Sequence, residues 1–488
     1  MNIASIDLGS NSFHMVILEL KKGHINVLDR QKEKLKLASK KNLVYINEKS
    51  YITDNAISKI VEIVQKFKIV ASLYNARIIA VATSAIREAE NSNEIVQRIY
   101  KESGIKVDVI SPYEEGRLAY LGAVYSLDYY EKDVTVIDIG GGSIQFVRGK
   151  KGTIKKIKSF RMGVIRLTEN FFEEGYNKSK AKELLDYIES QLEPISVYFS
   201  SAEIFIGVSG TIENVARLCN KVSKNSNSNG LVITYDGINK IFDSISDITK
   251  DESVFNYIDS SRKDTIVAGI ILLKCIFEYF NIQKLQVSSY GIREGNVISL
   301  MKKEYLSNVR YSSTRHILKR FNIDKTHAKN VCNFAIRIFD ILKNVHNLEK
   351  NWKDYLFSAS MLHDVGKIIS FNNHQEHSEY IISHSQIIGY TEREKKIISK
   401  IALYHKNQNI DDEDYEIKVL AGILRIADSL DKSGVSLFKD LKYDPYNKKL
   451  TIFLQKGKMF NIFSYYIEQK KKLLTQTLKI KVEVLLLD

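Results

Sequence analysis

The segment Ile6-Asp7-Leu8-Gly9-Ser10-Asn11-Ser12 recurs later in the chain as Ile137-Asp138-Ile139-Gly140-Gly141-Gly142-Ser143. Each copy follows an apolar, β-branched run and leads into another, at Phe13–Ile17 and at Ile144–Val147. Such runs are typical of strands. Each copy therefore predicts a strand, a glycine-containing loop and a second strand. Two copies of one unit indicate two like domains that face each other across a cleft.

The chain around these two segments alternates short apolar runs with helical patterns. Strands are predicted at Ile3–Ile6, Phe13–Leu18, Ile78–Ala82, Val134–Ile137 and Ile204–Ile206, and helices at Asp54–Phe67, Lys178–Leu192 and Thr265–Tyr279. After residue 313 the pattern is almost wholly helical, except for a hairpin predicted over Leu441–Leu454. We predict four domains: α/β domains over 1–125 and 126–307, an all-α domain over 308–435, and a small α/β subdomain over 436–488.

Composition narrows the class of protein. Of 488 residues, 44% are hydrophobic and 27% are charged, which excludes wholesale disorder. Three cysteines cannot form a disulfide framework, which favours a reducing, cytoplasmic setting. The apolar run from Ile266 ends at Lys274, well short of the roughly 18 residues of a membrane helix, and Asp7 interrupts the first apolar stretch, so no signal peptide is expected.

The net charge of +14 favours polyanionic ligands. The alternative, a solvated surface rich in lysine, stays open. Nucleic acid is disfavoured as a partner, because no recognition module and no stripe of aromatic and basic residues stands out.

The two repeated loops are candidate phosphate sites. Glycine lets the backbone approach a ligand closely, and exposed N–H groups and serine hydroxyls can donate to phosphate oxygens. The candidate phosphate-binding residues are Ser10, Asn11, Ser12, Gly140, Gly141, Gly142 and Ser143. The aspartate before each loop would repel phosphate unless a divalent cation such as Mg²⁺ lay between them. The alternative is two ordinary hairpins with an Asx turn.

Three further segments are candidates for the same site. Gly207-Val-Ser209-Gly210-Thr211 lies between a strand and a helical pattern, where free N–H groups can hold an anion. Arg87 follows a predicted strand and could bind phosphate through its guanidinium group. The alternative is that its segment begins a helix with Ser84 as the N-cap. Glu114-Glu115 opens a helix, on which only one of the two can face a site; that one could act as general base, or both could merely complement the helix dipole.

Eight of the ten histidines follow residue 310. His327, the pair His363-Asp364 and Asp428 lie in helical patterns. Two imidazoles and two carboxylates suit a divalent cation such as manganese, iron, magnesium or zinc, which can activate water for attack on a phosphoester. His374, His377 and His405 are candidates for contacting phosphate or supporting the ligands. The alternative is a cluster satisfied structurally.

Several segments of the first part together resemble the exopolyphosphatase / guanosine pentaphosphate phosphohydrolase (Ppx/GppA) family. They are Asp7-Leu-Gly-Ser-Asn-Ser-Phe-His-Met, Thr83-Ser-Ala-Ile-Arg-Glu-Ala, Glu114-Glu-Gly-Arg-Leu, Asp138-Ile-Gly-Gly-Gly-Ser, Met162-Gly-Val-Ile-Arg-Leu-Thr-Glu, Gly207-Val-Ser-Gly-Thr and Gly291-Ile-Arg-Glu-Gly. The resemblance implies two actin-like, duplicated RNase H-like domains and Mg²⁺-dependent removal of the terminal phosphate of inorganic polyphosphate or pppGpp. By match, Glu115 would activate water, Asp138 would support the metal, and Arg87 and the glycine loops would bind phosphate.

The chain departs from this family in two places. Where the second loop usually continues Ser-Thr-Glu, it reads Ser143-Ile144-Gln145, and an uncharged amide is a poorer Mg²⁺ ligand than a carboxylate and cannot act as a base. We assign Gln145 to the catalytic set but leave open whether it weakens turnover. The segment Leu35-Lys36-Leu37-Ala38 stands where many relatives have Arg-Leu-Gly, so no arginine contact is expected there.

Residues 313–435 resemble the HD-domain phosphohydrolases, through the histidine and aspartate set named above together with Lys367. The resemblance implies an HD-type helical domain with a second divalent metal. The relatives also suggest a homodimer. Three functions follow: a cleft exopolyphosphatase, an HD-type nucleotide phosphohydrolase, or a protein that binds polyphosphate or an alarmone with weakened turnover.

Overall fold

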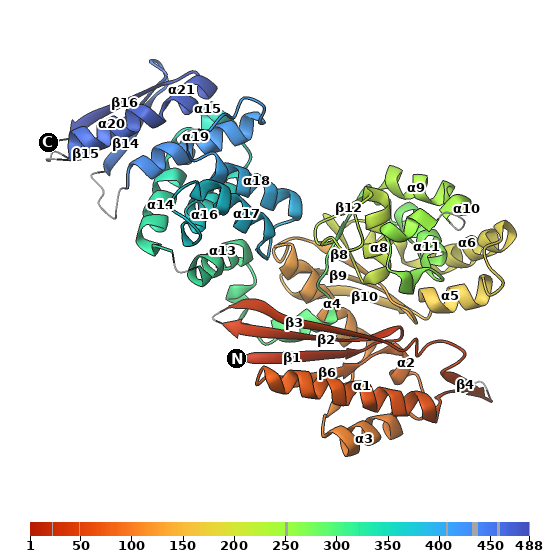
Figure 1. The fold of residues 1–488 in the computed structure, drawn as a ribbon. Helices are drawn as coiled ribbons and strands as arrows, with labels where there is room; N and C mark the ends of the chain where they lie inside the picture. The colour runs from red at the N-terminus through yellow and green to blue at the C-terminus, as the bar shows by residue number, and fades with distance from the viewer. Residues whose placement is uncertain are drawn as a thin grey trace. The chain divides into compact units, whose positions relative to one another are not determined.

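The structure is a computed structural model that describes residues 1–21, 23–47, 49–248, 252–321, 323–406, 408–431, 438–455 and 459–487. The chain divides into two compact units, Met1–Ser307 (unit 1) and Asn308–Asp488 (unit 2) (Figure 1). Each unit has hydrophobic core clusters of its own.

The first half of unit 1 is built on a sheet with the strand order β3-β2-β1-β6-β7 among the described residues. The central strand, β1, pairs antiparallel with β2 and parallel with β6. Its apolar side chains are fully buried, which fits a strand covered on both faces. The elements of this half are β1 (Asn2–Leu8), β2 (Ser12–Lys21), β3 (His24–Lys34), β4 (Leu43–Ile46), β5 (Lys49–Ile52), α1 (Asp54–Leu73), β6 (Arg77–Ala82), α2 (Ser84–Arg87), α3 (Ser92–Ser103), β7 (Val107–Val109) and α4 (Pro112–Ser126).

The second half repeats this plan with the order β10-β9-β8-β11-β13-β12, again counted over the described residues. Here β8 pairs antiparallel with β9 and parallel with β11, as β1 does with β2 and β6. Its elements are β8 (Val134–Ile139), β9 (Ile144–Lys150), β10 (Thr153–Phe160), α5 (Val164–Phe171), α6 (Lys178–Leu192), η1 (Glu193–Ile195), α7 (Ser196–Phe199), β11 (Ile204–Val208), α8 (Gly210–Asn220), β12 (Val232–Thr234), α9 (Tyr235–Asp243), α10 (Ile245–Ile248), η2 (Glu252–Asn256), η3 (Ser260–Arg262), α11 (Ile266–Tyr279), β13 (Lys284–Val287), α12 (Ile292–Ile298) and η4 (Lys303–Tyr305).

The duplication read from the sequence is therefore a duplication of the sheet itself, in agreement with the prediction of two like domains. Helix α12 does not stay with the second sheet: it packs against α4, β1 and β2 of the first half. A Cβ atom added to Gly295 would lie 2.0 Å from the Leu118 carbonyl oxygen, so glycine permits α12 to approach α4 this closely.

Unit 2 is helical up to residue 429 and ends in a small sheet with the order β14-β15-β16 in its described part. Its elements are α13 (Val309–Arg320), α14 (Lys325–Ile341), α15 (Lys343–His346), α16 (Lys350–Leu362), η5 (Val365–Ile368), α17 (His374–His384), α18 (Glu392–Leu403), α19 (Tyr415–Ser429), β14 (Phe438–Asp444), β15 (Lys449–Gln455), α20 (Phe460–Lys470), α21 (Lys472–Leu478) and β16 (Lys481–Leu487).

The predicted strands, helices and hairpin are all present. Helix α6 has the predicted bounds, and α11 is buried along most of its length, as its apolar composition indicates. Strand β16 was not expected; it pairs parallel with β15. Among the described residues no helix combines the length and the hydropathy that crossing a membrane requires.

Candidate active site

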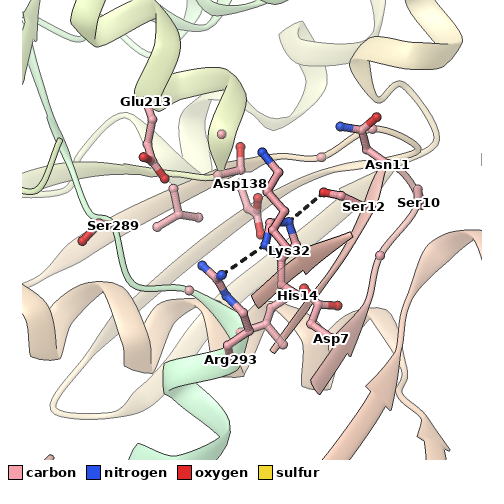
Figure 2. A pocket seen from close by; sticks show the side chains of 18 of the residues that line it. Asp7, Ser10, Asn11, Ser12, His14, Lys32, Asp138, Glu213, Ser289 and Arg293 are labelled. Atoms are coloured by element: carbon pink, nitrogen blue, oxygen red, sulfur yellow. Dashed lines mark hydrogen bonds between the residues drawn. The ribbon is translucent and has the colours of Figure 1, made fainter. Parts of the chain in front are cut away.

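A cavity of about 660 Å³ lies in unit 1, and both repeated loops line it (Figure 2). The loops contact each other closely. A Cβ atom on Gly142 would lie 2.9 Å from Ser10 Oγ, and one on Gly141 would lie 3.2 Å from the Asn11 Cβ. The missing side chains of these glycines therefore let the two halves of the repeat meet at one site. All seven predicted loop residues from Ser10 to Ser12 and from Gly140 to Ser143 line the cavity.

Three carboxylates meet in this cavity, from the ends of β1 (Asp7) and β8 (Asp138) and from the first turn of α4 (Glu115). Burial and the neighbouring Glu115 charge raise the pKa of Asp138 to about 7. Burial raises the pKa of Asp7 to about 7 as well, although Arg293 opposes the shift. The Asp7 Oδ1 atom is buried and has no hydrogen-bond partner among the described residues. Grouped, partly unpaired carboxylates are the donor set that Mg²⁺ prefers, so the residues present fit this ion.

Glu115 is the member of the Glu114-Glu115 pair that faces the cavity. Glu115 is only 6% exposed, whereas the Glu114 carboxylate is paired with Arg117. Glu115 Oε2 accepts a hydrogen bond from Arg87 Nη1 at 2.7 Å. Burial nevertheless raises the pKa of Glu115, because it outweighs the lowering effect of Arg87. A raised pKa makes this carboxylate a stronger base.

Arg87, predicted to bind phosphate, does not line the cavity. Its Nη1 donates to Glu115 and also to the Ile110 carbonyl oxygen at 2.9 Å. The structure therefore places Arg87 behind Glu115, where it fixes the orientation of that carboxylate. Its segment begins α2 with Thr83 at the N-cap rather than Ser84.

Gln145 lies on β9 directly opposite Asp138 in the strand pairing. The side chain is 2% exposed, and within the described part of the chain neither polar atom of its amide makes a hydrogen bond of ordinary geometry. It does not line the cavity. The amide thus lies beneath the carboxylates, in the position where a glutamate would add a fourth negative charge.

The third predicted loop contributes only in part. Ser209 and Gly210 line the cavity, but Ser209 Oγ donates to the Ile139 carbonyl oxygen at 2.6 Å. Thr211 does not line the cavity; its hydroxyl accepts from Arg262 Nη1 at 3.3 Å. Arg262 of η3, which donates to Thr211, lines the cavity beside this loop.

The sequence did not identify the basic side chains of the cavity. Arg30 and Lys32 come from β3, Arg262 from η3 and Arg293 from α12. Arg293 lies in the family-like segment Gly291-Ile-Arg-Glu-Gly. For the other three the sequence offered no signal except the overall positive charge, because only the fold brings them together.

His14 was also missed, and its hydrogen bonds set the orientation of Ser12 (Figure 2). Arg293 Nη1 lies 3.3 Å from His14 Nδ1, and His14 Nε2 lies 2.7 Å from Ser12 Oγ. Since the guanidinium can only donate, Nδ1 accepts and Nε2 carries the proton that it donates to Ser12. Burial and Arg293 hold the pKa of His14 well below its usual value. The Ser12 O–H is then available to donate to a ligand in the cavity.

In unit 2 the four metal-ligand candidates converge. His327 Nε2 lies 3.4 Å from Asp364 Oδ2 and 3.6 Å from Asp428 Oδ1, and His363 Nε2 lies 3.6 and 3.7 Å from the same two atoms. All four side chains are buried. The sequence missed Asp431, whose Oδ2 is 2.6 Å from His327 Nδ1; its spacing of three residues from Asp428 would have been the signal.

Comparison with known proteins gives matches along most of the chain. Residues 16–304 match the model of the Ppx/GppA phosphatase family, and residues 309–479 match that of Ppx/GppA phosphatase domain III. A Ppx/GppA family member from Aquifex aeolicus is 32% identical, with a TM-score of 0.54; the match covers 61% of this chain and 97% of that one. An exopolyphosphatase from Cytophaga hutchinsonii shares the fold at 23% identity and a TM-score of 0.55, over 62% of this chain and 99% of that one.

Proposed function

The chain belongs to the Ppx/GppA phosphatase family, and from this we propose that unit 1 removes the terminal phosphate of inorganic polyphosphate, of pppGpp, or of both. The observation that carries the proposal is the meeting of two glycine loops and three carboxylates in one cavity. The loops supply N–H and O–H donors for phosphate oxygens. The basic side chains around them favour a substrate with many negative charges.

In this proposal Glu115 takes the proton from the attacking water. Its raised pKa makes the carboxylate a stronger base, and the hydrogen bond from Arg87 holds it in place. Ser12, oriented by His14, and the backbone N–H groups of Gly141–Ser143 donate to the phosphate that is being released. Asp7 and Asp138 would hold Mg²⁺, which when bound supplies charge neutralisation for the phosphate oxygens.

Phosphate release from long-chain polyphosphate and from pppGpp, with Mg²⁺, tests the proposal. We expect Glu115→Gln to lower kcat by about 100- to 10,000-fold, since a general base contributes about that much. Glu114→Gln is the matched control, because its carboxylate pairs with Arg117, and should keep near wild-type activity. If Glu115→Gln kept wild-type kcat on both substrates, the proposed site would be wrong. Comparing the two substrates identifies the preferred one.

We also propose that unit 2 is an HD-type domain that holds a divalent metal ion on His327, His363, Asp364 and Asp428. The convergence of the four side chains supports this. An ion there supplies Lewis acidity for phosphoester hydrolysis. Loss of polyphosphate hydrolysis in His363→Ala, but not in Glu115→Gln, would move the main activity to unit 2. Binding of polyphosphate or pppGpp without release of phosphate would favour a sensor.

The homodimer that the resemblance predicts is tested by light scattering of the full-length protein.

A further inference from the structure

A row of three lysines joins the two halves of unit 1. Lys32, Lys36 and Lys40 follow one another at intervals of four residues, from the end of β3 into the connection to β4. Each lysine forms an ion pair with a carboxylate of the second half. The Nζ–O distances are 2.8 Å for Lys32–Asp259, 2.9 Å for Lys36–Asp264 and 2.8 Å for Lys40–Glu173. We refer to residues 32–40 as the strap.

The backbone of the strap is bound to the first glycine loop. The Lys36 N–H donates to the Asn11 carbonyl oxygen at 2.8 Å, and the Ala38 N–H donates to the Ser10 carbonyl oxygen at 3.1 Å. Leu37, between these two donors, is fully buried in the core of the first half. The strap and the first loop are therefore one rigid piece. A force on the lysines acts directly on the loop.

The three carboxylates belong to parts of the second half that also border the cavity. Asp259 and Asp264 flank Arg262 in the sequence, and Arg262 lines the cavity. Glu173 follows α5, and the N–H of the first residue of α5 donates to the Gly140 carbonyl oxygen at 3.0 Å. The ion pairs of the strap thus connect the first glycine loop both to Arg262 and to the second glycine loop.

The innermost pair of the row belongs to the cavity itself. Lys32 and Asp259 both line it, and Figure 2 shows the Lys32 side chain there. The other two pairs do not line the cavity. The row therefore runs outward from the lining of the cavity and spans the two halves on one side of it.

Each of these pairs is weak on its own, because it is exposed to solvent. The three lysine side chains are 33% to 60% exposed. An exposed ion pair shifts an equilibrium between two conformations by roughly 1.4- to 5-fold. Opening of the cavity on this side breaks all three pairs, so their separate contributions multiply to about 3- to 100-fold. Salt removes this contribution, since the screening length falls from about 10 Å at 0.1 M to about 3 Å at 1 M.

We propose that the strap is an electrostatic closing device, which holds the two halves of unit 1 together beside the cavity through Lys32, Lys36 and Lys40. At low ionic strength the three pairs keep the cavity closed. Screening or removal of these charges lets the halves separate. The inference concerns access to the cavity and does not depend on which compound unit 1 hydrolyses.

A distance between the two halves tests the proposal. Spin labels on the full-length protein at Tyr100→Cys of α3 and Tyr187→Cys of α6 report on the first and the second half, because both positions are exposed. Cys219→Ser leaves only buried cysteines beside them. Double electron–electron resonance should give one main distance in about 0.05 M NaCl. In about 1 M NaCl we expect a longer distance whose population is at least about 3-fold larger.

Charge reversal distinguishes the strap from other effects of salt. Lys36→Glu with Lys40→Glu should populate the longer distance at low salt, because each glutamate repels its former partner. Adding Asp264→Lys and Glu173→Lys forms both pairs again with exchanged charges and should restore the short distance. Lys66→Glu is the matched control, because Lys66 pairs within α1 and should leave the distance unchanged.

The same distance at both salt concentrations and in the reversed strap would overturn the proposal. Closure would then depend on the less exposed pair of Glu88 with Arg166, which also joins the two halves at 2.9 Å. A longer distance that persists after the charges are exchanged would overturn it as well, because restored pairing would then have no effect. Loss of phosphate release in every variant would count against the function proposed for unit 1 and would leave these distances as they are.

Discussion

At the scale of single residues, Gln145 places a buried, uncharged amide opposite Asp138 on the neighbouring strand. We expect Gln145→Glu to lower the melting temperature without Mg²⁺, because a fourth buried carboxylate repels Asp138 and Glu115. Added Mg²⁺ should restore it, since the ion neutralises that charge. Calorimetry with and without Mg²⁺ measures both effects. Equal melting temperatures of the two proteins in both conditions would mean that position 145 lies outside the metal environment.

His346 gives unit 2 a pH-dependent stability. Its Nδ1 accepts from the Leu348 N–H at 2.9 Å, and its Nε2 lies 2.9 Å from the Phe339 carbonyl oxygen, so the folded ring is neutral. Burial lowers the pKa of His346 below 6.5. Below pH 6.5 the unfolded chain therefore binds a proton that the folded chain does not, and unfolding becomes easier, by at most about 1.4 kcal/mol per pH unit.

We expect His346→Gln to reduce this pH dependence between pH 7 and pH 5. Denaturant unfolding at several pH values measures the slope. His384→Gln is the control, because His384 is exposed and should leave the slope unchanged. An identical slope in His346→Gln would show that other groups carry the acid sensitivity.

The residues that sequence alone identified are those with a local pattern. The two aspartates and their glycine loops repeat one motif, so each copy supports the other. Arg30, Lys32 and Arg262 have no such pattern. Their roles arise from contacts between segments far apart in the chain, which no local spacing encodes.

At the scale of elements, the contact between α12 and α4 depends on Gly295. A Cβ atom there would overlap the Leu118 carbonyl oxygen. We expect Gly295→Ala to destabilise unit 1 by about 3 kcal/mol, because the obstacle is backbone rather than a flexible side chain. Gly291→Ala, where a Cβ would meet no atom within 4 Å, should change stability by less than about 0.5 kcal/mol. The free energies of unfolding of both variants, measured with denaturant, test this prediction. Equal losses of stability in the two variants would contradict it.

Elements were predicted well where their ends carry local signals. Asn177 caps α6 by accepting from the Ser179 and Lys180 N–H groups, and the predicted start was correct. Strand β16 was missed because it pairs parallel with β15 only after the chain has passed through α20 and α21. Its short apolar run alone does not distinguish a strand from a buried helical turn.

At the scale of the whole molecule, unit 1 and unit 2 have separate hydrophobic cores, so we expect each unit to unfold on its own. The core cluster of unit 2 contains no residue of unit 1, and the main clusters of unit 1 contain none of unit 2. We expect two calorimetric transitions. Mg²⁺ with polyphosphate at about 100 times its Kd should stabilise unit 1 alone, by about 2.7 kcal/mol. Gly295→Ala destabilises unit 1, so the transition whose temperature it lowers is the transition of unit 1. One transition that shifts as a whole would reject independent unfolding.

The return of α12 to the first sheet also limits how the cavity of unit 1 can move. The chain passes from the first half to the second after α4 and comes back through α12, and these two helices pack against each other. Two lobes joined by a single linker can swing in many directions, but two adjacent crossings act as one hinge. Any opening of the cavity would thereby be reduced to rotation about one axis, and a ligand that contacts both glycine loops would hold that hinge shut for as long as it stays bound.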